Sequence, residues 1–216
     1  MLNPYSLRDP TMAVDVVCIG AHSDDIEIGC GGTMLRLLAN RPGSRVRWVV
    51  LSATPEREAE ARASAGDFLA GAASVEVEVA HFRESYFPDE WLQLKDFFNE
   101  LRRGGTDPDL VLCHHRYDEH QDHRTVAELT WNTWRNNLIA EYEIPKYEGD
   151  LGRPNVFVPI PPELAERKVE LLFKHFGSQG DKHWFRPEVF TGLMAVRGVE
   201  AGVAAAEAFH VRKLVV

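Results

Sequence analysis

The sequence predicts an α/β fold, a Rossmann-like three-layer sandwich with a mostly parallel sheet and helices on both faces. Short apolar runs that suit strands alternate along the chain with longer segments that suit helices, which is typical of a covered parallel sheet. The first run, at residues 14–20, is almost purely apolar, as expected for a strand buried on both faces. The length of 216 residues fits one domain, and we expect a single domain over residues 1–216 with a short arm at about 1–12.

The strands are expected where apolar and β-branched residues run together between turn-forming residues. Four such runs are clear, at residues 14–20, 45–52, 74–80 and 110–113. Two weaker runs follow at 138–143 and 155–159. Between these last two, residues 147–154 contain two glycines, a proline and three charges, so we expect a long loop there.

The helices are expected at residues 31–38, 56–70, 90–103, 122–138 and 162–176. The clearest is 90–103, where Trp91, Leu94, Phe98 and Leu101 form one apolar stripe that ends at two glycines. Helix 31–38 ends near an Arg-Pro-Gly stop signal, helix 56–70 ends at a glycine, and helix 162–176 begins with a proline. Apolar residues within 189–196 and 203–209 could pack internally or between subunits, so a homo-oligomer stays open.

Composition narrows the class of partner. The formal net charge of −9 argues against a nucleic acid or an anionic membrane surface as the main partner. No apolar run approaches the roughly 20 residues of a membrane span, and the first residues contain no apolar signal core. The three cysteines, Cys18, Cys30 and Cys113, show no paired spacing, which favours a reducing cytoplasm over a disulfide framework.

Two clusters of histidine and aspartate follow two of the predicted strands. The first is Ala-His-Ser-Asp-Asp at residues 21–25, directly after the first strand, and the second lies within residues 115–123, after strand 110–113. The carboxyl ends of parallel strands form the binding edge of an open sheet. We therefore expect the two clusters to meet at one site, although they lie about 90 residues apart in the chain.

The residue types in these clusters suit one metal ion and a reactive water. His22, Asp25 and His123 would form a set of two histidines and one carboxylate, and catalytic zinc sites use three such ligands and leave one position open. The same set could hold iron or another divalent ion. Asp24 could accept a proton from the water, and His120 could stabilise an oxyanion or protonate a leaving group.

Simpler interpretations exist for each feature. The two aspartates could cap the following helix, and the histidine-rich stretch could be an exposed loop, but both clusters at strand ends favour a site. His114 and His115 are expected to pack or to bond to the backbone rather than to bind metal. The glycine-rich segment 29–32 lacks the spacing of a dinucleotide-binding loop, so we expect its glycines to allow close backbone approach. The aromatic stretch 183–187 could line a sugar site, although a core or subunit contact is favoured.

With both clusters defined, the chain resembles the LmbE-like (PIG-L) family of zinc-dependent N-acetylglucosaminyl deacetylases. The family's first motif, Ala-His-Pro-Asp-Asp-Glu and a glycine-rich turn, corresponds to residues 21–33, and its His-x-Asp-His motif to residues 120–123. Weaker similarity to the family includes Arg-x-x-Glu-Ala at residues 57–61 and extends over much of the chain to residue 179. Ser23 stands where the family has proline and Ile26 where it has an acidic residue, and neither change removes an expected ligand or base.

The resemblance implies roles that agree with the chemistry above. His22, Asp25 and His123 would bind one Zn²⁺ per chain, and Asp24 would be the general base. His120 would stabilise the tetrahedral oxyanion. Asp122 would support a histidine, as carboxylates beside metal ligands do. Arg57 matches an arginine that contacts substrate in some members, and the alternative is a solvated helix charge paired with Glu60.

We therefore expect a cytoplasmic zinc-dependent hydrolase that removes the N-acetyl group from an N-acetylglucosamine-type sugar or conjugate. One alternative is a metal-dependent phosphoesterase, which would use a second metal and further carboxylates, such as Asp118 and Asp122. The other is a metal-stabilised sugar-binding protein without catalysis, in which Asp24 and His120 would be dispensable.

Overall fold

The computed structural model describes residues 12–105 and 107–214, and its strands form one seven-stranded sheet in the order β3-β2-β1-β4-β5-β7-β6. Strands β1 to β5 pair in parallel, β7 runs antiparallel to β5, and β6 runs antiparallel to β7. The predicted mostly parallel sheet is therefore confirmed. The strand bounds are β1 Asp15–Gly20, β2 Arg45–Val50, β3 Ser74–Val79, β4 Leu110–His114, β5 Leu138–Tyr142, β6 Val156–Pro159 and β7 Ala206–Val211. Of the predicted arm at 1–12, residues 1–11 lie outside the described part.

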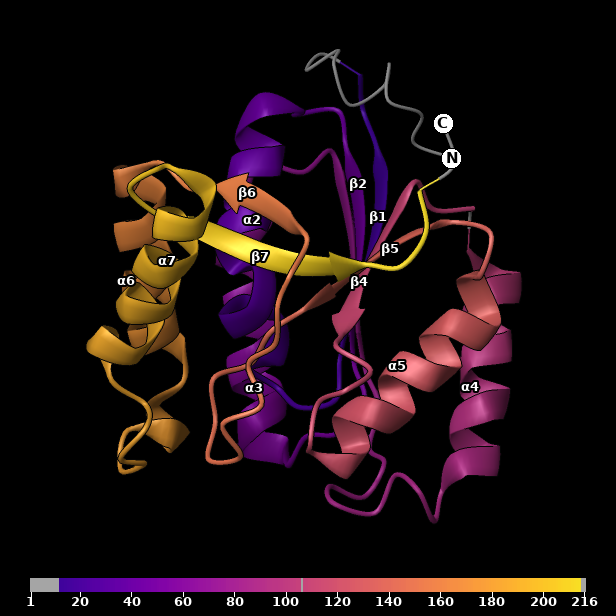
Figure 1. Cartoon of the computed structure of the whole chain (residues 1–216). Helices are drawn as coiled ribbons and strands as arrows, with labels where there is room; N and C mark the ends of the chain where they lie inside the picture. The colour runs from indigo at the N-terminus through magenta and orange to yellow at the C-terminus, as the bar shows by residue number, and fades with distance from the viewer. Residues whose placement is uncertain (1–11, 106, 215–216) are drawn as a thin grey trace.

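Helices cover both faces of the sheet, as predicted (Figure 1). Helices α4 and α5 pack on one face, and α2, α3, α6 and α7 lie on the other. Their bounds are α2 Asp25–Asn40, α3 Pro55–Phe68, α4 Trp91–Gly104, α5 Gln121–Trp134, α6 Pro162–His175 and α7 Pro187–Ala201, with a 3₁₀ turn η1 at Gly177–Gln179. Within the described residues, no helix is both long and apolar enough to cross a membrane.

Strand β1 explains why the run at residues 14–20 is almost purely apolar: helices cover the strand on both faces of the sheet. Val16 and Cys18 join the core beneath α2 and α3, while Val17 and Ile19 join the core beneath α4 and α5. All four side chains are buried. Alternate residues of a strand point to opposite faces, so a central strand with helices on both sides needs apolar residues throughout.

Strands β1 and β4 are neighbours, and the chain order reverses between them. Strands β2 and β3 follow β1 on one side of the sheet, whereas β4 and β5 lie on its other side. The loops that leave β1 and β4 therefore diverge at the carboxyl edge, which is the position where open α/β sheets bind ligands. The two histidine and aspartate clusters lie in these two loops and in the first turns of the helices that follow them.

Helix α2 begins at Asp25, six residues earlier than the predicted 31–38, and is broken at Cys30, whose φ of −145° and ψ of 15° are not helical. A side chain at Gly29 would begin 2.2 Å from a ring carbon of Tyr142, and one at Gly31 would begin 2.6 Å from the Phe68 ring. The glycines therefore allow close packing inside a buried helix, which was the favoured prediction, and they form no phosphate loop.

A buried ion pair spans this break. The carboxylate of Glu207, on β7, accepts hydrogen bonds from the backbone nitrogens of Gly32 at 2.8 Å and Thr33 at 2.6 Å. Lys168, on α6, donates to Glu207 at 2.6 Å and to the Ile28 carbonyl oxygen at 2.6 Å. A helix break leaves backbone groups without helical partners, and these two side chains supply partners on both sides of it.

One α-helix and one strand were not predicted, and another helix ends early. Helix α7 and strand β7 occupy the apolar regions that were left unassigned, and helix α5 ends at Trp134, four residues before the predicted 138. Beyond it, Asn137 donates through its side chain to the Pro108 carbonyl at 2.7 Å, which fixes a turn there. In the aromatic stretch 183–187, Phe185 is 3% exposed and Trp184 packs against the same core, as the core interpretation expected.

Candidate metal centre

Three donor atoms from the two clusters converge between β1 and β4. His22 follows β1, Asp25 begins α2 and His123 lies in the first turn of α5, and all three are buried. His22 Nδ1 lies 3.3 Å from Asp25 Oδ2 and 3.3 Å from His123 Nε2, and the latter two atoms are 3.6 Å apart. Ligands about 2.1 Å from a tetrahedral zinc are about 3.4 Å from one another, so this spacing fits one ion with a fourth position open.

The electrostatics of this set favour a cation. Burial by itself would lower the pKa of His22, but Asp25 and Asp122 raise it to about 10. Burial by itself would raise the pKa of Asp25, but the neighbouring histidines, led by His123, hold it well below its usual range. Burial lowers the pKa of His123 to about 3, which favours the neutral ring that metal ligation requires. The raised pKa of His22 means that its ring would release a proton as an ion binds.

Asp122 lies behind His22. Its Oδ2 is 3.2 Å from His22 Nε2, the ring nitrogen that faces away from the other donors. The same carboxylate accepts hydrogen bonds from the backbone nitrogens of Ser85 at 2.6 Å and Phe87 at 3.1 Å. A carboxylate at this place fixes the tautomer and the orientation of a ligating ring. Ser85 itself has a φ of 69°, an uncommon conformation for a residue other than glycine.

Asp118 holds His123 in the same way, a role that was not predicted from the sequence. Asp118 Oδ2 lies 2.9 Å from His123 Nδ1, and its Oδ1 accepts a hydrogen bond from the backbone nitrogen of His120 at 2.8 Å. The position of an aspartate five residues before a ligand histidine was the available clue. Asp118 and Asp122 are the carboxylates that a two-metal phosphoesterase would use, and both instead bond to histidine rings.

Asp24 occupies the N-cap position of α2, but its side chain makes no capping hydrogen bond. Its Oδ1 accepts a hydrogen bond from Arg57 at 2.7 Å, so Arg57 faces the centre. Glu60, the alternative partner of Arg57, accepts hydrogen bonds from the backbone nitrogen and hydroxyl of Ser178. Burial raises the pKa of Asp24, and the Arg57 guanidinium opposes that rise.

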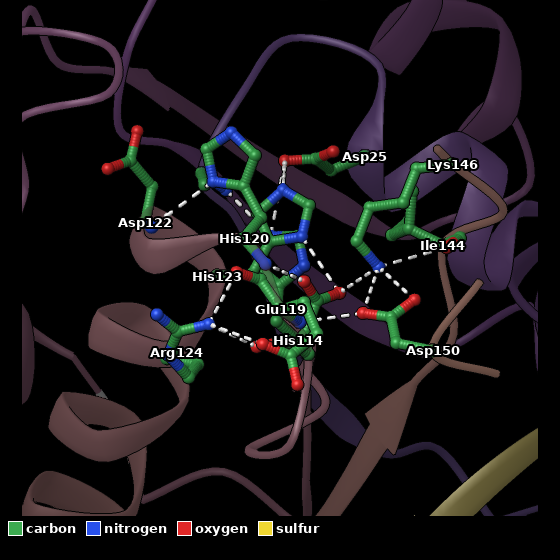
Figure 2. Close-up of polar contacts among 12 residues, drawn as sticks. Asp25, His114, Glu119, His120, Asp122, His123, Arg124, Ile144, Lys146 and Asp150 are labelled. Atoms are coloured by element: carbon green, nitrogen blue, oxygen red, sulfur yellow. Dashed lines mark hydrogen bonds and ion pairs between the residues drawn. The ribbon is translucent and has the colours of Figure 1, made fainter. Parts of the chain in front are cut away.

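His120 stands beside the donor set, at the N-terminal end of α5 (Figure 2). Its ring stacks on His123 with centroids 4.6 Å apart, and its centroid is 5.0 Å from that of His22. Its Nδ1 accepts the Asp122 backbone N–H at 3.2 Å, so the proton of a neutral ring sits on Nε2. Burial lowers the pKa of His120, and the neutral ring still offers this Nε2–H as a donor.

Two further combinations of donors lie close enough to share an ion. They are His22, His120 and His123, and Asp25, His114 and His123. In the second set His114 Nε2 already accepts the backbone N–H of Ala21 at 2.9 Å, so its lone pair is engaged. His114 thus bonds to the backbone, as the sequence analysis favoured. Both sets share His123, which makes this histidine central to any ion bound here.

Comparison with known proteins relates this geometry to a family. The family model described as "PIG-L: GlcNAc-PI de-N-acetylase" matches residues 17–134, which is more than half of the chain. The match begins in β1 and ends with α5, so it includes both clusters. The chain is also 28% identical over 169 residues to "Uncharacterized deacetylase YaiS" of Escherichia coli (strain K12), an alignment that covers 74% of this chain and 89% of that protein.

Two solved structures are similar in fold. One is the N,N'-diacetylchitobiose deacetylase of Pyrococcus horikoshii in complex with its inhibitor MPG, with a TM-score of 0.70, 24% identity and coverage of 92% of this chain and 84% of that one. The other is GalB, the 4-carboxy-2-hydroxymuconate hydratase of Pseudomonas putida KT2440, with a TM-score of 0.73, 20% identity and coverage of 95% and 98%. A deacetylase and a hydratase thus share this fold, so the fold by itself does not identify the reaction.

Proposed function

The chain belongs to the PIG-L family, and we propose on that basis that it is a zinc-dependent hydrolase that removes the N-acetyl group from an N-acetylglucosamine-type sugar or conjugate. The observation that carries the proposal is the triangle of donor atoms from His22, Asp25 and His123, with edges of 3.3, 3.3 and 3.6 Å. These three residues would hold the ion. Zinc would supply Lewis acidity, which lowers the pKa of water to about 7 and polarises a carbonyl.

Asp24 carries out the proton transfers in this proposal. It takes a proton from the water whose oxygen attacks the acetyl carbon, and it delivers that proton to the nitrogen as the C–N bond breaks. The products are acetate and the free amine. The contact with Arg57 at 2.7 Å supports a role for Arg57 in orienting Asp24. The proposed contact of Arg57 with the substrate rests on the resemblance to the family.

His120 stabilises the transition state in this proposal. Its Nε2–H donates a hydrogen bond to the oxyanion that develops when the acetyl carbon becomes tetrahedral. The hydrogen bond that its Nδ1 accepts from the Asp122 backbone supports this tautomer. Asp122 orients His22 and Asp118 orients His123, so neither carboxylate is free for a second metal.

Sugar substrates are supported by the family description and by one structural neighbour. The family is described by its action on GlcNAc-PI, and the Pyrococcus enzyme is named for N,N'-diacetylchitobiose. We also propose that the whole chain forms one deacetylase domain, since every strand of the described residues joins the same sheet.

The three cysteines are free and buried, which supports a cytoplasmic location.

The decisive experiment measures metal content and acetate release together, on purified protein with a panel of N-acetylglucosaminyl compounds. The wild type is expected to bind about one zinc per chain, as a single three-ligand site implies, and to release acetate. Asp24→Asn should keep the zinc and lose about 10²–10⁴-fold in turnover, while His123→Ala should lose the zinc as well. Asp67→Asn, at an exposed ion pair with Lys174, is the control and should match the wild type.

Each outcome separates the hypotheses. Normal turnover in Asp24→Asn would show that another group is the base. Two metals per chain with phosphate release from phosphate esters would favour the phosphoesterase instead. Zinc binding with no acetate from any compound would favour the non-catalytic sugar-binding protein.

A further inference from the structure

The long loop between β5 and β6 is tied to the metal centre through one lysine (Figure 2). Lys146 Nζ lies 2.9 Å from Asp118 Oδ2 and 2.6 Å from Asp150 Oδ2, and it donates to the Ile144 carbonyl oxygen at 3.4 Å. The three protons of the ammonium group therefore face three acceptor groups: two carboxylates and one carbonyl. The side chain of Lys146 is only 11% exposed, so these contacts lie largely out of water.

Asp118 connects this lysine to a proposed metal ligand. The same oxygen, Oδ2, is 2.9 Å from Lys146 and 2.9 Å from His123 Nδ1. The other oxygen accepts the backbone N–H of His120 at 2.8 Å. If Lys146 were removed, Asp118 would keep its two histidine partners but lose the contact that fixes its outer side, and the carboxylate could rotate away from the His123 ring.

Asp150 makes a second connection to the same segment. Its Oδ2 accepts the backbone N–H of Glu119 at 2.6 Å, and its Oδ1 accepts a hydrogen bond from Lys146 at 2.7 Å. Lys146 and Asp150 thus bond to residues 118 and 119 from a loop that lies outside the two metal motifs, and Asp118 in turn bonds to the backbone of His120. The next residues begin α5 and carry His123.

We propose that Lys146 is a positioning residue of the metal centre: through Asp118 it fixes the His123 ring for ligation, and with Asp150 it fixes the backbone that carries His120. The inference rests on the proposed function, because it assumes that His123 binds the ion and that His120 acts on the substrate. Lys146 itself contacts neither ion nor substrate. Its side chain bonds only to Asp118, Asp150 and the Ile144 carbonyl among the described residues.

The test compares Lys146→Met, Lys146→Arg and a matched control, Lys174→Met, which removes an exposed lysine paired with Asp67. Zinc affinity is measured without substrate, by competition with a chromophoric chelator. Lys146→Met is expected to weaken zinc binding about tenfold, the low end of the loss seen when partners of metal ligands are removed. Lys146→Arg should recover most of this loss, since a guanidinium also donates to two carboxylates.

Steady-state kinetics at saturating zinc separate positioning from general loosening. Because Lys146 acts on the proposed catalytic groups and not on the sugar, Lys146→Met should lower kcat by about tenfold with KM nearly unchanged. The control should match the wild type in zinc affinity, kcat and KM. Thermal unfolding of each variant shows whether the protein is folded, and Asp150→Asn, which keeps the side-chain volume, replaces Lys146→Met if that variant does not fold.

A folded Lys146→Met protein with wild-type zinc affinity and wild-type kcat would overturn the inference, as would a wild-type result for Asp150→Asn in its place. In either case the proposed function would stand, provided that the wild type binds zinc and releases acetate. A wild-type protein that binds no zinc would instead overturn the proposed function, and this inference with it.

Discussion

Replacing Lys168 by methionine tests how strongly the buried ion pair stabilises the broken helix α2. Lys168 and Glu207 are 2% and 4% exposed, and their charged groups are 2.6 Å apart. Removing one partner of a buried pair costs about 3–5 kcal/mol, because it leaves the other charge uncompensated. Glu207 would keep two backbone hydrogen bonds at the start of a helical segment, which favours an anion, so we expect the low end, about 3 kcal/mol.

The reverse change should cost more. In Glu207→Gln the amide accepts one backbone N–H but turns its own NH₂ group toward the other. Lys168 stays charged and keeps the Ile28 carbonyl as an acceptor, but it loses its anionic partner. We expect a loss of about 4–5 kcal/mol. The double variant removes both charges, so its loss should be smaller than the sum of the two by about 2 kcal/mol.

The assay is urea unfolding at neutral pH and 25 °C for the wild type, both single variants and the double variant. For a chain of this size, a loss of 3 kcal/mol corresponds to a fall of about 6–12 °C in Tm. Lys174→Met is the control, because that lysine is 58% exposed and its ion pair should contribute less than about 1 kcal/mol. The reasoning is refuted if Lys168→Met costs no more than the control, or if the two single losses simply add.

Three further predictions concern the strained loop, acid and metal. The φ of 69° at Ser85 suits glycine, so Ser85→Gly should leave the free energy of unfolding unchanged or raise it by up to about 1 kcal/mol. Ser85→Val should lower it by about 1–2 kcal/mol. Equal stability of the two variants in urea unfolding would contradict this prediction. Burial and the neighbouring His115 lower the pKa of His210 to about 4, so the folded state resists its protonation and stability should fall as pH drops from about 6.5 toward 4. His210→Gln should show a shallower fall in Tm over this window, and an unchanged slope would reject the assignment. Zinc at about 100 times its Kd should raise the free energy of unfolding by about 2.7 kcal/mol, and a chelator should reverse this; no change in Tm on adding zinc would contradict the metal site.

The convergence of the two clusters could be predicted from sequence because it depends only on strand ends. Two apolar runs that are each followed by histidine and aspartate place those side chains at one edge of a parallel sheet, wherever the runs lie in the chain. That the two strands are direct neighbours, with β1 beside β4, became clear only from the order of strands in the sheet. The donor triangle of His22, Asp25 and His123 follows from that adjacency.

Asp122 was expected to support a histidine, but the contacts of Lys146 and Glu207 could not be predicted, because they join residues that carry no local pattern. Lys146 reaches Asp118 from a loop, and Glu207 reaches α2 from a strand that was not predicted at all. Strand β7 was missed because it carries a buried glutamate and a histidine within a short apolar run. Helix α7 was missed because its apolar residues lie on more than one side, with Val199 81% exposed.

The cap that Glu207 places on α2 has a consequence for the order in which the protein is built. Gly32 and Glu207 are 175 residues apart, so a ribosome releases the helix long before it releases the carboxylate that completes it. Until β7 has been synthesised and has entered the sheet beside β5, the nitrogens after the break must be satisfied by water. The helix that begins at Asp25 therefore leaves the ribosome well before β7 and reaches its final form only after β7 has joined the sheet.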